Sequence, residues 1–150
     1  MILTELFNPT ECLEAIRLLG GEIVMAYGPN GRVDRVLQYD SDRDRFVLFV
    51  YGVGEVACSI EEAGCIIQVA AEQTVNAANV RYYCEHGETH NGPPYAVERT
   101  EAEEGNTPFG IATLTEEGKW ARHGKPALFQ TKLAALLAAL RAVKETRDGA

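Results

Sequence analysis

The stretch from residue 22 to residue 51 constrains the fold most, because it contains three strand patterns with only short polar turns between them. The first pattern, EIVMAY at 22–27, leads into a GPNGR turn whose Asn-Gly pair tolerates the positive φ angles of a tight hairpin. A return strand is expected at 32–39, and a DSDRD loop leads to a third strand at 45–51. The six consecutive apolar residues of the third strand favour burial on both of its faces. The stretch therefore predicts a β-meander.

A helix is expected before the meander. Asn8 and Pro9 supply an N-cap and an N1 proline, and a glutamate two residues after the proline completes a variant of the capping box. Apolar residues then recur at helical spacing up to Leu19. The Gly20-Gly21 pair stops the helix, because glycine adopts the left-handed conformation at little cost.

A second helix is expected after the meander, where residues 59–62 form another capping box. Gly64 leaves two alternatives open. In one, the helix ends after a single turn and 65–70 form a strand; in the other, it continues to about Gln73. The longer helix is favoured because its apolar residues share one face: Ile60, Ala63, Ile67 and Ala70.

The second half of the chain contains further strands and a long final helix. Strand patterns occupy 79–85, 95–101, 109–115 and 119–123. The final helix carries an apolar stripe made of Phe129, Leu133, Leu136, Leu137, Leu140 and Val143. We therefore expect one α+β domain over 1–150, with an antiparallel sheet (the β-meander plus further hairpin strands) packed by an N-terminal helix and a long C-terminal amphipathic helix.

Composition bounds the class and the compartment. The chain is 46% hydrophobic and 24% charged, which is typical of a soluble globular protein. No apolar run approaches the ~20 residues that span a bilayer, and the first residues lack the pattern of a secretory signal. We expect a cytoplasmic protein whose four cysteines are thiols: Cys12, Cys58, Cys65 and Cys84.

The net charge of -8 is unevenly distributed. The segment from Glu55 to Glu117 contains twelve acidic residues and only two basic ones, Arg81 and Arg99, which gives it a net charge of -10. Such a surface disfavours direct contact with nucleic-acid phosphates or an anionic membrane. It favours a basic protein surface as the partner, although acidic residues that serve solubility alone remain an alternative.

The segment YYCEHGETHNGPPY, residues 82–95, raises the question of a metal site. Cys84, His86 and His90 could supply three zinc ligands, with a neighbouring glutamate as a fourth ligand or as a base for bound water. Zinc sites usually draw on two separated ligand pairs, however, and no second pair occurs in the chain. We therefore interpret the segment as a polar loop and expect no metal and no cofactor, with a small metal-dependent hydrolase as the alternative.

Two other motifs resemble known sites only in outline. The GVGEVA stretch at 52–57 matches a dinucleotide fingerprint, but it follows an antiparallel meander instead of opening a parallel βαβ unit. The DSDRD loop at 40–44 resembles the start of a calcium loop, but Arg45 and Tyr51 stand where that loop needs glycine and glutamate. We interpret the DSDRD loop as a charged hairpin turn, and we expect no dinucleotide site at 52–57.

The leading hypothesis is a non-enzymatic, acidic protein-binding domain: a chaperone, adaptor, immunity protein or inhibitor. The candidate contacts are Glu98, Glu101, Glu103, Glu104, Glu116 and Glu117, with Tyr82, Tyr83 and Tyr95 as aromatic anchors. A homodimer through the Ala-rich flank of the final helix (Ala134, Ala135, Ala138, Ala139 and Ala142) is a further expectation. A small-ligand-binding domain, with a pocket between the sheet and the long helix, is a second alternative.

Overall fold

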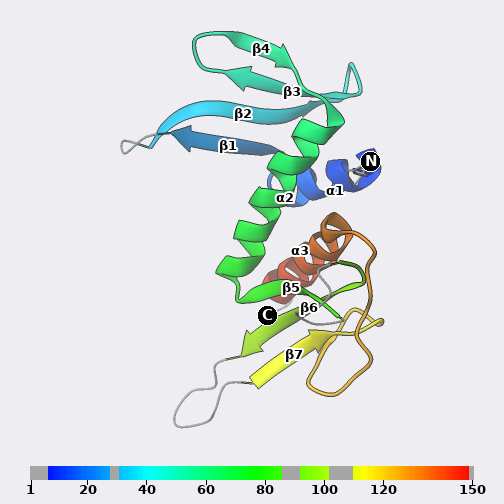
Figure 1. The fold of residues 1–150 in the computed structure, drawn as a ribbon. Helices are drawn as coiled ribbons and strands as arrows, with labels where there is room; N and C mark the ends of the chain where they lie inside the picture. Colours follow the sequence, from blue (N-terminus) through cyan, green and yellow to red (C-terminus); the bar gives the residue numbers. More distant parts are fainter. Residues whose placement is uncertain (1–6, 28–30, 86–91, 102–109, 149–150) are drawn as a thin grey trace. The chain divides into compact units, whose positions relative to one another are not determined.

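The computed structural model describes residues 7–27, 31–85, 92–101 and 110–148. Its elements are α1 (Pro9–Leu18), β1 (Glu22–Tyr27), β2 (Arg32–Asp40), β3 (Arg45–Val50), β4 (Gly54–Ala57), α2 (Ile60–Ala77), β5 (Val80–Cys84), β6 (Tyr95–Glu101), β7 (Gly110–Leu114), β8 (Trp120–Ala121) and α3 (Lys132–Asp148). They form two compact units, Met1–Ala70 and Ala71–Ala150, and the boundary falls inside α2 (Figure 1). The expectation that the chain behaves as one domain stays a prediction.

The expected start and end of α1 are confirmed. The Oδ1 atom of Asn8 accepts hydrogen bonds from the backbone N–H groups of Thr10 and Glu11, at 2.8 and 3.2 Å. These bonds satisfy two donors that the first helical turn would otherwise leave unpaired. At the other end, Gly20 and Gly21 have φ angles of +104° and +92°, values that only glycine adopts readily.

The first sheet confirms the β-meander and adds a strand to it. Its order is β1-β2-β3-β4, and all neighbours are antiparallel. The GVGEVA stretch is the hairpin turn and β4, with positive φ at Gly52 and Gly54. The sequence does not predict β4, because two glycines in a short stretch are unfavourable in a strand.

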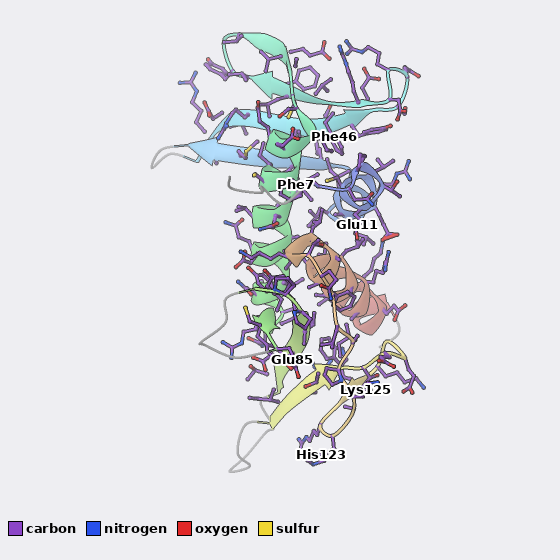
Figure 2. The ribbon with its side chains drawn as sticks, turned by 45° about the vertical axis from the view of Figure 1, so that its right-hand side comes forward. Phe7, Glu11, Phe46, Glu85, His123 and Lys125 are labelled. Carbon is purple, nitrogen blue, oxygen red and sulfur yellow. The ribbon has the colours of Figure 1, made fainter. Side chains whose placement is uncertain are left out.

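One face of the first sheet forms the core of the first unit. The register aligns Ile23, Leu37 and Leu48 in a row across three strands, and all three are buried. Buried residues of α1 and of the first half of α2 complete this core: Cys12, Ala15, Ile16, Ala63 and Ile67. Phe46 points from the sheet toward these helices (Figure 2).

Helix α2 is the longer of the two expected alternatives. It begins at the predicted capping box, where the backbone N–H of Glu62 donates to Ser59 Oγ at 3.1 Å, and it runs to Ala77. Residues 65–70 are therefore helical. Gly64 stands inside the helix because the ring of Phe7 lies against it and fills the space that a Cβ atom would need.

The remaining strands form a separate sheet in the second unit, with the order β5-β6-β7-β8 and antiparallel neighbours throughout. Sequence patterns predicted these strands but not their division into two sheets. Most buried residues of β5, β6 and β7 share one face of this sheet: Val80, Tyr95, Val97, Ala112 and Leu114. Helix α3 contacts β5 and β6 and carries the buried leucines of the expected stripe, whereas Phe129, also expected in that stripe, precedes the helix. The fold class is α+β, with the N-terminal and C-terminal helices packed on antiparallel sheets, as expected.

Among the described residues, no helix has the length and apolar character needed to cross a membrane.

Candidate functional site

The acidic residues of the second unit differ in how far they are engaged. Glu98 lies on β6 directly across from Arg81 of β5, and its Oε1 atom pairs with Arg81 Nε. The Glu98 side chain is only 14% exposed, so its charge is offset within the sheet. Glu98 therefore stabilises the β5–β6 pair and presents little free charge to a partner.

Glu116 and Glu117 are exposed in the turn between β7 and β8. The Oε1 atom of Glu116 lies 3.7 Å from Lys125 Nζ, and both side chains are largely exposed. Because water and salt screen such a pair, it holds Glu116 only weakly. Glu101 ends β6. Glu103 and Glu104 lie outside the described residues.

The three tyrosines take different positions. Tyr95 is 6% exposed, and its backbone N–H and carbonyl both bond with Phe129, at 2.7 and 2.8 Å. Its ring meets that of Tyr82 edge to face, with 5.7 Å between the ring centroids. Tyr95 is thus a core residue of the second unit, and Tyr82 is half-buried against it.

Tyr83 lies on the other face of the second sheet, one residue along from Tyr82. It is half-buried, and this burial raises the pKa of its hydroxyl, with a further contribution from the nearby carboxylate of Glu85. A hydrogen bond with Thr113 acts in the opposite direction. Tyr83 therefore carries a neutral hydroxyl next to exposed acidic charge, which suits a polar aromatic contact.

Of the three candidate metal ligands in the 82–95 segment, the structure describes only Cys84. Cys84 closes β5 opposite Tyr95 and is a free, half-buried thiol. His86 and His90 lie outside the described residues, so the metal alternative stays a prediction. Within the described ranges, no group of three His, Cys, Asp or Glu side chains converges as a metal site would require.

Two other thiols have the wrong chemistry for a nucleophile. Burial raises the pKa of Cys58, and Glu62 raises it further; the thiol donates to the backbone carbonyl of Ser59 at 3.6 Å. Burial also raises the pKa of Cys12, to about 11, with a smaller effect from Glu11. A reactive cysteine needs a lowered pKa, so neither thiol is prepared for catalysis.

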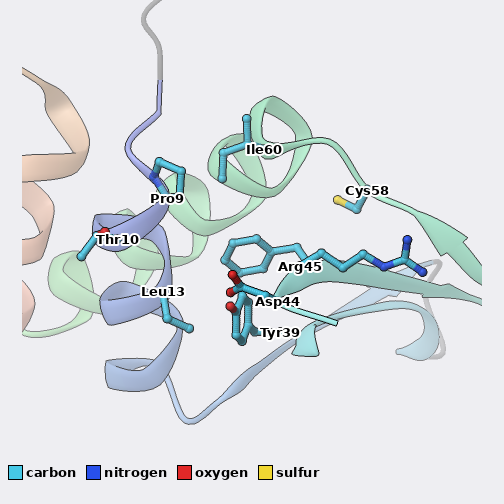
Figure 3. Close-up of a pocket in the computed structure, with 9 residues that line it drawn as sticks. Pro9, Thr10, Leu13, Tyr39, Asp44, Arg45, Cys58 and Ile60 are labelled. Atoms are coloured by element: carbon cyan, nitrogen blue, oxygen red, sulfur yellow. The ribbon is translucent and has the colours of Figure 1, made fainter. Parts of the chain in front are cut away.

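A cleft in the first unit was not predicted from the sequence. It lies where the start of α1, the β2–β3 hairpin and the start of α2 meet, and its volume is about 390 Å³. Its lining residues are Pro9, Thr10, Leu13, Tyr39, Asp44, Arg45, Phe46, Cys58 and Ile60. Asp44 and Tyr39 face Leu13 across the cleft (Figure 3). Because the lining comes from three separate segments, no local pattern in the sequence could have indicated it.

Comparison with known proteins adds no assignment. The chain matches no family model, no curated protein and no solved structure.

Proposed function

We propose that this chain is a non-enzymatic protein-binding domain whose second unit binds a basic protein surface. One observation carries the proposal: Glu85, Glu116 and Glu117 are exposed in the second unit, and Arg81 and Arg99 of its sheet have partners within that unit. Arg81 pairs with Glu98, and the guanidinium of Arg99 lies 4.9 Å from the centre of the Trp120 ring.

The exposed acidic residues define where a partner would bind. Glu116 and Glu117 lie together in the β7–β8 turn, and Glu85 is exposed at the end of β5. A basic surface would meet these carboxylates in water, so the attraction would mainly raise the association rate and would fall with added salt. Tyr83, half-buried near Glu85, supplies an aromatic contact in the same unit.

The residues proposed from the sequence divide into two groups. Tyr95 and Glu98 are held by internal contacts, and they support the binding surface without forming its exposed part. Glu101, Glu103 and Glu104 remain part of the proposed contact set. The proposal includes a cytoplasmic location, which suits four free cysteines because disulfides rarely persist there.

Affinity capture tests this proposal. Full-length protein immobilised through a terminal tag is exposed to native lysate at low salt, and the bound proteins are identified by mass spectrometry. We expect a basic partner that about 0.5 M salt releases. At that salt concentration the Debye length is only a few ångströms, so the attraction between exposed charges is largely screened. Recovery of no salt-released partner would contradict the electrostatic mechanism.

Binding of a small ligand in the cleft of the first unit is a second candidate function. The cleft volume of about 390 Å³ falls in the range of small-molecule sites. Its lining combines apolar side chains with Tyr39, Asp44 and Thr10, which can fix the orientation of a polar ligand. The pocket expected from the sequence, between the sheet and the long final helix, corresponds to a second cleft of about 280 Å³ in the second unit, whose lining includes Leu114 of β7 and Arg141 of α3.

Native mass spectrometry of gently purified protein tests the second candidate. We expect a retained small molecule in the wild-type protein and its loss in Leu13→Trp, which fills the cleft from α1. Ile111→Trp, at an exposed position in the second unit, is the matched control. Only apo protein in every preparation would count against a resident ligand.

A further inference from the structure

The first sheet carries an exposed apolar row on the face opposite its core. The register places Val24, Val36 and Phe49 side by side across β1, β2 and β3. Val24 is 52% exposed and Phe49 is 39% exposed, while Val36 is half-buried between them. Tyr51, two residues after Phe49, is 65% exposed. We call this surface the outer face.

The outer face follows from the alternation of side chains along the strands. Each residue of the exposed row has a buried neighbour in its own strand, and that neighbour points to the opposite face of the sheet. These buried neighbours are Ile23, Leu37 and Leu48. Within the described part of the first unit, α1 and the first half of α2 lie on that buried side (Figure 1). A strand pattern that is apolar on both faces normally has both faces covered.

Several polar groups on the outer face are paired with one another. Gln38 Nε2 donates to Glu22 Oε2 at 2.9 Å on neighbouring strands. Arg43 bridges the carboxylates of Asp40 and Glu55. The apolar row therefore lies among groups whose hydrogen-bonding needs are largely met without a charged partner.

The charge of this face is close to balanced. Its cations include Arg43 and Arg32, whose guanidinium lies 4.1 Å from the centre of the Tyr51 ring. Its anions include Glu22, Asp40 and Glu55. This contrasts with the chain as a whole, whose net charge is -8.

We infer that the outer face is a homodimer interface covered by a second copy of this chain. Two copies that each carry -8 repel over most of their surfaces, and a near-balanced apolar face is where that repulsion is least. A two-fold interface requires a face that can meet its own copy, and Arg32 and Glu22 lie at opposite ends of the β1–β2 pair. A two-fold axis lying across the strands sets the Arg32 end of one face against the Glu22 end of the other. A strongly basic partner, by contrast, would gain little attraction from this near-balanced face.

This assignment differs from the dimer seam expected on the final helix. Ala135 and Ala139 are fully buried and Ala142 is 6% exposed, so the Ala-rich flank of α3 is engaged within the structure. The outer face is small: four strands about 4.8 Å apart make it roughly 20 Å wide, which places it at the low end of specific interfaces. The dimer is therefore weak and depends on concentration.

Sedimentation velocity of the full-length protein from about 1 to about 300 μM tests the inference. We expect the wild-type protein to shift from monomer to dimer over this range. Val24→Glu and Phe49→Glu each place a charge in the apolar row, so we expect each to weaken dimerisation at least about tenfold. Val69→Glu makes a similar change at a 55% exposed position on α2 and serves as the control that still dimerises.

Circular dichroism establishes that each variant is folded before its association is interpreted. Val24→Glu, at the more exposed position, gives the decisive result if Phe49→Glu unfolds. A wild-type protein that stays monomeric throughout overturns the inference, and so does a dimer that survives in folded Val24→Glu. Since dimerisation is independent of partner capture, either proposal can fail while the other holds.

Discussion

Gly64 shows how one position can look ambiguous in the sequence and have a definite role in the structure. Glycine in a helix interior costs about 1 kcal/mol relative to alanine, so the sequence alone allows Gly64 either to end the helix or to stand inside it. The ring of Phe7 lies where a Cβ atom would project from Gly64. The residue is therefore required by a contact with a segment more than fifty positions earlier, which no local pattern reports.

Gly64→Ala is expected to destabilise the protein even though alanine is the better helix former. Displacing the Phe7 ring costs about 1–3 kcal/mol by overpacking, which outweighs the gain of about 1 kcal/mol in helix propensity. Urea unfolding measures the change. In the Phe7→Ala background the same substitution should become neutral or stabilising, and an unchanged penalty there would contradict the contact.

Cys12 makes stability depend on pH in the alkaline range. Its folded-state pKa is about 11, raised from 9.0 by burial and by Glu11. Between these values the unfolded chain has lost the thiol proton while the folded chain retains it, so rising pH favours unfolding. The expected loss of stability is up to about 2–3 kcal/mol between pH 9 and 11.

Comparison of the wild-type protein with Cys12→Ala isolates this effect. Cys58 and Tyr83, whose pKa values are also raised, are present in both proteins and cancel in the difference. We expect the free energy of unfolding to fall less steeply above pH 9 in the variant. Parallel pH profiles would show that Cys12 does not titrate differently on folding.

At the scale of elements, the sequence predicted the starts and ends of helices, because these features depend on residues that are close together in the chain. Asn8, Ser59 and the Gly20-Gly21 pair began or ended helices as expected, because a cap is a contact between residues two to four positions apart. The glycine-rich β4 and the separation of two sheets were missed. Both depend on pairing between strands, which strand propensity does not determine.

The candidate sites follow the same division. The exposure of Glu116 and Glu117 can be predicted from their charge and from the glycine that follows them, since a turn places such residues on the surface. The burial of Tyr95 came from its bridge to Phe129 and its contact with Tyr82, both of which are tertiary. The cleft lined by Tyr39 and Asp44 was missed for the same reason.

The N-cap of α1 offers a direct test at this scale. Asn8→Ala removes the acceptor of two backbone hydrogen bonds and should cost about 1 kcal/mol. Asn8→Asp retains an acceptor oxygen and should leave stability nearly unchanged. Thermal unfolding of the three proteins measures both effects, and equal losses in the two variants would contradict the capping role.

At the scale of the molecule, the boundary between the two units falls inside α2. Ala63 and Ile67 are buried residues of the first unit, and Ala71 and Val75 are buried residues of the second. One continuous helix thus supplies core residues to both. This favours coupled unfolding, in keeping with the prediction of a single domain.

Trp120, the only tryptophan, reports on the second unit by fluorescence, whereas Gly64→Ala perturbs the first. Coupled unfolding predicts that this substitution lowers the midpoint seen by Trp120 as much as the midpoint seen by far-UV circular dichroism. An unchanged Trp120 midpoint alongside a lowered circular dichroism midpoint would show two independent domains.

The central claim is that the acidic residues of the second unit bind a basic protein, and its most direct test is capture with a charge-reversed variant. Glu116→Lys/Glu117→Lys reverses the exposed turn, while Asp42→Lys/Glu61→Lys makes the same change in net charge at exposed positions of the first unit. We predict that the first variant retains less than about one tenth of the partner captured by the wild-type protein, and that the second retains most of it. Equal capture by the wild-type protein and the Glu116/Glu117 variant would contradict the claim.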